Sequence, residues 1–206
     1  MKKRITVLTL AIVICFTVVA AASVNEEYKG FSIVNVLVNG QKLESQVPGV
    51  NFHDSTVLPL KAVSEAMNTI VDWDSKTNTA NLIKPEVNII VMDDILENED
   101  ETISLYNPFG LIPQHEVMDF FALVQVHELK EGNYEFRIVI SDPNGKEVVV
   151  SPTDTYKVEK DSFGGFDYYE LFENVSFHKL GEYVVQFQLK HNSKFYTVGE
   201  KTLVVY

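Results

Sequence analysis

The chain has 206 residues, 46% of them hydrophobic, with 17 basic and 29 acidic side chains and a formal net charge of −12. This composition is typical of a globular protein and excludes a wholly disordered chain. The net negative charge disfavours nucleic acid and anionic lipid as partners, because both carry charge of the same sign.

The N-terminal residues have the order of a secretory signal. Basic residues at positions 2–4 precede an almost unbroken apolar run over residues 5–19, and Ala20-Ala21-Ala22 follows. This pattern predicts that residues 1–22 are a signal peptide cleaved near Ala22, leaving a secreted, extracellular or cell-envelope protein. The apolar run also approaches the length that spans a bilayer, so retention as an anchor is the alternative. We expect no membrane span in the mature chain.

The single cysteine, Cys15, lies inside this apolar run. A lipoprotein signal would make Cys15 the acylated residue, but it needs a small residue just before the cysteine, and Ile14 stands there. Once the signal is removed, the chain has no cysteine, and therefore neither disulfides nor a thiol nucleophile. The mature chain then has 14 basic and 29 acidic residues, a net charge of −15.

Residues 31–84 predict a compact α+β unit. Valines at positions 34, 36 and 38 alternate as in a strand, and Asn39-Gly40 predicts a tight turn because both residues tolerate positive φ. Two closing strands are expected at residues 70–73 and 79–83. In this arrangement Trp73 is expected in the core, with the neighbouring aspartates exposed at a turn.

One helix is predicted in this unit. Pro59 suits the first helical turn, where its missing N–H is not needed. Leu60, Val63 and Met67 recur at helical spacing, which predicts an amphipathic helix of about ten residues. Asn68 can end the helix in the left-handed conformation.

These residues resemble the copper amine oxidase N-terminal domain-like family, a small α+β module of secreted proteins of Gram-positive bacteria. The resemblance is carried by Val38-Asn39-Gly40-Gln41, Leu58-Pro59-Leu60-Lys61-Ala62-Val63, Val71-Asp72-Trp73-Asp74 and residues 78–83. Asp54-Ser55-Thr56 departs from the family's usual Gly-Arg pair, and Asn68 stands where the family usually has glycine. In the oxidases this module is a stalk without copper or quinone, so the resemblance implies a positioning role and no cofactor. Asn133-Tyr134-Glu135 matches the quinone-forming triplet only in its letters.

The remainder of the chain predicts a connector and a second domain. Residues 92–102 are densely acidic, and residues 85–102 are expected to form an acidic connector. Residues 103–206 contain alternating apolar runs separated by turn signals such as Asp142-Pro143-Asn144-Gly145, without a helical pattern. This arrangement predicts an antiparallel, immunoglobulin-like β-sandwich, so the whole chain is expected to be mostly β.

Two segments are candidate binding sites, each with a structural alternative. The carboxylates of Asp93, Asp94, Glu97 and Asp100 suit calcium, although the acid spacing and glycine of an EF-hand are absent, and a solvated connector explains the same residues. Around Gly164-Gly165, the rings of Phe163, Phe166 and Tyr168 suit a sugar face or an apolar partner. The alternative is that these rings fill the sandwich.

No catalytic, cofactor or metal site is predicted. The five histidines at positions 53, 115, 127, 178 and 191 lack the close pairs of a zinc or copper site. A Gly-x-Ser-x-Gly elbow, a phosphate loop and a dinucleotide fingerprint are absent. Asp72 and Asp74 do not by themselves indicate a glycosidase, which needs two carboxyls in a cleft, one with a raised pKa.

The sequence therefore predicts a secreted or envelope-associated, non-catalytic binding or structural protein. Its expected partner is a cell-envelope polymer or an extracellular protein. One alternative is a hydrolase of envelope polymers that uses scattered aspartates and glutamates. The other is a regulator of a partner extracellular enzyme.

Overall fold

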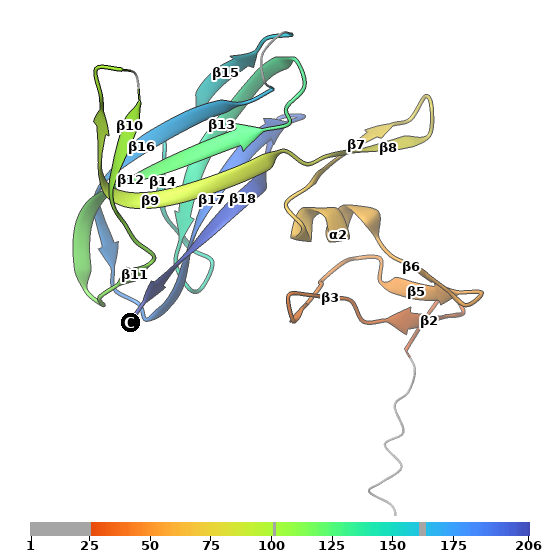
Figure 1. Cartoon of the computed structure of the whole chain (residues 1–206). Helices are drawn as coiled ribbons and strands as arrows, with labels where there is room; N and C mark the ends of the chain where they lie inside the picture. The colour runs from red at the N-terminus through yellow and green to blue at the C-terminus, as the bar shows by residue number, and fades with distance from the viewer. Residues whose placement is uncertain (1–25, 101, 161–163) are drawn as a thin grey trace, which may run out of the picture. The chain divides into compact units, whose positions relative to one another are not determined.

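A computed structural model describes residues 26–100, 102–160 and 164–206 (Figure 1). The predicted signal at residues 1–22, with Cys15, and the ring of Phe163 lie outside the described residues. The chain divides into two compact units, with the division between Pro59 and Leu60. The predicted helix and closing strands thus group with the sandwich, whereas the sequence suggested a boundary near residue 84.

The first unit is built on a four-stranded antiparallel sheet in the order β1-β2-β5-β6, together with a hairpin of β3 and β4. Its strands are β1 (Glu27–Tyr28), β2 (Phe31–Val34), β3 (Leu37–Val38), β4 (Gln41–Lys42), β5 (Gly49–Phe52) and β6 (Ser55–Val57). Asn39 and Gly40 have φ values of 51° and 81°, which confirms the predicted tight turn between β3 and β4.

The second unit begins with α2 (Leu60–Ala66), which is shorter than predicted and turns a different face inward. The predicted apolar face is wrong, because Leu60 and Met67 are exposed, whereas Ser64 is buried. The Ser64 carbonyl accepts the N–H groups of Met67 and Thr69, and Asn68 has a φ of 55°, so the helix ends where predicted. Helical spacing identified the helix but not which side contacts β7 (Ile70–Asp74).

The strands from β9 onward form two sheets of a β-sandwich (Figure 1). One sheet has the order β10-β9-β12-β16, and the other has the order β11-β18-β17-β13-β14, with β15 also pairing with β13. The strands are β8 (Thr79–Ile83), which pairs with β7, β9 (Glu86–Glu97), β10 (Ile103–Pro108), β11 (Leu111–Ile112), β12 (Glu116–His127), β13 (Gly132–Ser141), β14 (Glu147–Val150), β15 (Asp154–Val158), β16 (Phe166–Phe177), β17 (Gly181–His191) and β18 (Lys194–Val205).

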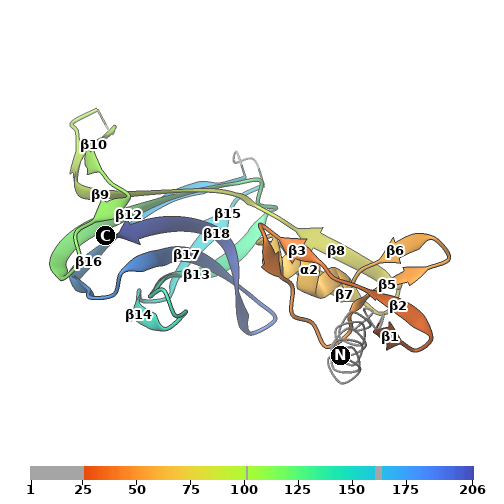
Figure 2. The same cartoon turned by 90° about the horizontal axis from the view of Figure 1, so that it is seen from below.

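The strand order is that of an immunoglobulin-like sandwich, as predicted. β9, β12 and β16 take the places of strands A, B and E, and β13, β17 and β18 take those of C, F and G. β11 is short and runs parallel to β18, whereas the other pairs are antiparallel. Between β9 and β11 the chain adds β10, which pairs with the last half of β9. Figure 2 shows this β9–β10 hairpin continuing beyond the sheet.

The inner faces of the two sheets form the hydrophobic core. The predicted alternation in β13 and β17 is confirmed, because the inward residues are almost fully buried. These residues are Phe136, Ile138, Ile140, Tyr183, Val185, Phe187 and Leu189. Tyr134 packs against the same core and donates its hydroxyl hydrogen to the Lys130 carbonyl, and burial raises its pKa. The tyrosine of the Asn-Tyr-Glu triplet therefore has a structural position.

The predicted acidic connector differs most from the structure. Its first part, Glu86–Glu97, is the long strand β9. Ile89 and Val91 from this strand are buried in the core, and residues 86–92 pair with β12. The acidic composition masked the alternation of apolar residues that makes this segment a strand. Charged residues dominate only the part of β9 that continues into the hairpin.

Candidate functional site

A small hollow lies in the first unit, between the β2–β5 pair and the β3–β4 hairpin. Its walls are held by backbone hydrogen bonds from Ile33 N–H to the Glu26 carbonyl (2.8 Å) and from Leu43 N–H to the Val36 carbonyl (2.9 Å). Gly49 forms part of the wall, and a Cβ atom there would lie 2.9 Å from Leu58 Cδ2. The side chain of Leu58 therefore lies close against the backbone at Gly49.

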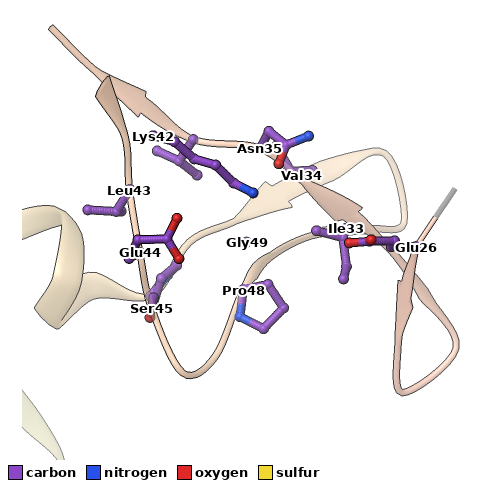
Figure 3. A pocket seen from close by; sticks show the side chains of 12 residues that line it. Glu26, Ile33, Val34, Asn35, Lys42, Leu43, Glu44, Ser45, Pro48 and Gly49 are labelled. Carbon is purple, nitrogen blue, oxygen red and sulfur yellow. The ribbon is translucent and has the colours of Figure 1, made fainter. Parts of the chain in front are cut away.

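Charged groups of both signs surround this hollow. Figure 3 shows Lys42 and Glu44 on one side and Glu26 on the other. These three side chains form no ion pair or side-chain hydrogen bond with another described residue. Asn35 and Ser45 add neutral polar groups to the rim. An ammonium and two carboxylates are thus available to a ligand that carries both charges.

The size of the hollow limits what it can hold. Its volume is about 130 Å³, whereas clefts that enclose drug-sized ligands measure about 300–1,000 Å³. It suits one side chain of a partner or a small ion. Ser45 is the one hydroxyl among the lining residues, and no histidine lines the hollow to activate it. The lining thus offers charged and polar groups to a small bound group.

A second candidate surface lies on the β7–β8 hairpin. Val71 pairs with Leu82 and Trp73 with Ala80, so these four side chains share one face of the two-stranded sheet. Trp73 is 58% exposed and Leu82 is 55% exposed. We call these four residues the hairpin face. The face is apolar without exception and lacks the polar groups that usually orient a sugar beside an aromatic ring.

The opposite side of the same hairpin contacts the sandwich. Ile70 is 2% exposed and belongs to the sandwich core. Asp72 Oδ1 lies 3.0 Å from Nε2 of His191, the last residue of β17, and accepts a hydrogen bond at 3.3 Å from Nδ2 of Asn192 in the turn that follows. Side chains alternate along a strand, so the inward positions of Ile70 and Asp72 place Trp73 outward. The prediction that Trp73 is a core residue is therefore wrong.

The predicted calcium candidates do not converge. Asp93 accepts a hydrogen bond from Asn107, Glu97 accepts one from the Tyr169 hydroxyl, and Asp100 accepts two from Thr102. Asp94 accepts one from the following backbone N–H. Within residues 26–100, 102–160 and 164–206, no group of three or more metal-ligating side chains gathers at one point. Calcium binding here stays a prediction without a preformed site.

The predicted aromatic site has two described members, and both pack inside the sandwich. Phe166 is 6% exposed and stacks on Tyr156, with ring centroids 4.4 Å apart. Tyr168 packs edge-to-face on Phe136 at 4.9 Å and donates its hydroxyl hydrogen to Glu170. This arrangement agrees with the structural alternative, in which the aromatic side chains fill the sandwich.

Among the described residues, the carboxyl groups with a clearly altered pKa have it lowered rather than raised. Three carboxyl groups of the described chain have a clearly altered pKa, and in Asp74, Asp100 and Asp142 it is lowered, first of all by a side-chain hydrogen bond. A glycosidase acid needs the opposite shift. The fold also brings His115 and His178 together, with ring centroids 6.1 Å apart, which sequence spacing could not reveal. No further metal-ligating groups gather around this pair within the described chain.

One family matches part of this chain. Residues 37–107 match the family described as copper amine oxidase N-terminal domain. The match includes the hairpin face and extends through β9 and β10, beyond the predicted end at residue 84. A search of curated proteins finds no match. No helix of the described residues is long and apolar enough to cross a membrane.

Solved structures with some likeness to the chain are distant. A CARDB domain from Pyrococcus furiosus, determined with two metal ions, is 8% identical, covers 59% of this chain and 94% of its own, and has a TM-score of 0.31. An immunoglobulin-like protein from Pseudomonas aeruginosa is 15% identical, covers 59% and 97%, and has a TM-score of 0.30. These scores carry no argument about function, and the strand order itself defines the sandwich.

Proposed function

We propose that this is an exported, non-catalytic binding protein that engages another extracellular protein through the hairpin face. The basic, apolar and small order of residues 1–22 supports export. The match over residues 37–107 supports a non-catalytic role, because this module is a stalk in the oxidases it resembles. The immunoglobulin-like sandwich supports a binding or structural role.

The observation that carries the proposal is the exposure of Trp73 and Leu82 on a face that the fold holds outward. Ile70, Asp72 and His191 fix the other side of the hairpin, so the hairpin cannot turn over to hide its apolar side without breaking those contacts. Tryptophan is enriched among residues that dominate protein interfaces. Aliphatic neighbours without polar groups favour a protein surface over a glycan.

A binding experiment tests this function. The mature chain, residues 23–206, is incubated with cell envelopes of the producing organism, and the bound fraction is measured by sedimentation, with and without calcium. Saturable binding that disappears after protease treatment of the envelopes is expected. Binding to purified, protein-free envelope polymer would instead identify a glycan partner. Absence of binding both to envelopes and to proteins captured from the culture medium would overturn the proposal. Dependence on calcium would implicate the acids at positions 93–100.

A further inference from the structure

The edge of β9 that faces away from β12 is unpaired over half of its length. β9 pairs with β12 through residues 86–92, but β10 covers the opposite edge only from Met92 onward. Phe109 N–H donates to the Val91 carbonyl at 2.9 Å, so the backbone groups of Val91 point away from β12. Backbone groups alternate in direction along a strand, so those of Val87 and Ile89 also point to this open edge. No other described residue hydrogen-bonds to them there.

A groove of about 410 Å³ lies along this open edge. Its lining residues are Asn88, Ile89, Ile90, Val91, Pro108, Phe109, Gly110 and Lys201. The groove therefore combines an apolar wall with backbone donors and acceptors in the arrangement that an added strand requires. A single side chain or a rigid ring cannot form hydrogen bonds with backbone groups spaced along a strand, but an extended peptide can.

Lys201 supplies the one charge among the residues that line the groove. It lies opposite Val185 in the β17–β18 pair, and Val185 is fully buried, so Lys201 occupies an inward-facing position on β18, in the part of the strand that β11 does not cover. Lys201 itself is exposed, and no described carboxylate pairs with it. An unpaired ammonium beside free backbone groups is complementary to a carboxylate on the incoming segment.

We propose that this groove binds a short extended peptide by strand addition to β9, with a carboxylate of the peptide paired to Lys201. The backbone groups of Val87 and Ile89 point to the open edge, so a segment of about four residues can form its hydrogen bonds there. The groove is separate from the hairpin face, so either binding surface can fail without the other.

An inward-facing lysine on an edge strand has another known effect, which is to prevent unwanted pairing between copies of a protein. The two roles differ in their consequences. If Lys201 only prevents strand pairing between copies, its removal should cause self-association and should leave the affinity for peptides unchanged. If Lys201 binds a carboxylate, reversal of its charge should weaken the binding of peptides that carry that carboxylate.

The test begins with selection from a library of random peptides of about eight residues with free C-terminal carboxylates, displayed against the mature chain. The backbone amides of Val87 and Ile89 should gain protection from hydrogen exchange in the complex with a selected peptide. Lys201→Glu should weaken the peptide by about tenfold or more, whereas the matched surface change Lys146→Glu should alter affinity by less than about twofold. N-methylation of alternate peptide amides should abolish binding, because it removes the donors of a strand.

Several outcomes contradict the proposal. Enrichment of no peptide is one, and a selected peptide that leaves the exchange of Val87 and Ile89 unchanged is another. Self-association of Lys201→Ala by sedimentation velocity, with peptide affinity unchanged, would assign Lys201 the role of preventing strand pairing instead.

Discussion

The contact between Gly199 of β18 and Val87 of β9 gives the sharpest test of how the two sheets pack against each other. A Cβ atom at Gly199 would lie 2.4 Å from Val87 Cγ1 and 2.7 Å from Val87 Cβ, far inside van der Waals contact. Gly199→Ala should therefore destabilise the fold by about 1–3 kcal/mol through overpacking. The φ of Gly199 is not in the left-handed region, so the backbone itself accepts alanine.

Removal of the two Val87 methyl groups should relieve this effect in part. Val87→Ala alone should cost about 1 kcal/mol, because the side chain is half-buried and loses two methyl groups. In the Val87→Ala background, Gly199→Ala should cost less than in the native background but remain destabilising, because the Cβ atom of residue 87 still lies 2.7 Å from the new methyl group. Urea unfolding of the four mature chains, followed by circular dichroism, measures this double-mutant cycle. Additive penalties, with no coupling of at least about 1 kcal/mol, would refute the close approach of β9 and β18.

Three further predictions concern the core, a turn and the hairpin. Phe120→Ala removes a fully buried ring and should cost about 3–5 kcal/mol, measured by the same unfolding assay. Asp142 accepts a hydrogen bond from Lys179, which first of all lowers its pKa below 3.8, so its stabilising effect should be present above that pH and lost as pH falls through the lower folded-state pKa. Asp142→Asn should accordingly flatten the stability profile below about pH 4, and an unchanged profile would contradict this assignment. Asp72→Asn weakens the contact with His191, so the amides of β7 should exchange faster while those of β12 keep their rates.

Local turn chemistry and strand alternation were sufficient to predict much of the fold. Asn39-Gly40 adopts the positive φ values that its residue types favour, and Gly145 does the same in the turn that follows Ser141. Strands β13 and β17 begin at Gly132 and Gly181, and each glycine is followed two residues later by a tyrosine. These features depend on neighbouring residues alone, so a single sequence contains the necessary information.

The candidate binding surfaces depend on which side of an element meets the sandwich, and the sequence does not contain that information locally. Val71, Asp72 and Trp73 alternate whichever side is buried, and only the contacts of Ile70 and His191 decide the matter. The open edge of β9 likewise arises because β10 starts to pair at Met92 and leaves the preceding residues uncovered. Pairing between distant strands determines both features.

The central claim is that the hairpin face binds a partner protein. Trp73 is 58% exposed, which is roughly 140 Å² for a tryptophan that can bury about 250 Å². Covering that area at about 25 cal/mol per Å² contributes about 3.5 kcal/mol, or about 300-fold in Kd. The matched control is Leu180→Ala, which removes a side chain that is 60% exposed in the turn between β16 and β17.

The most direct measurement compares the envelope affinity of the native mature chain with that of Trp73→Ala and Leu180→Ala by sedimentation, after circular dichroism confirms that all three are folded. Trp73→Ala should weaken binding by about 300-fold, whereas Leu180→Ala should stay within about threefold of the native chain. Equal affinities for all three proteins, or an equal loss in both variants, would contradict the assignment of the hairpin face.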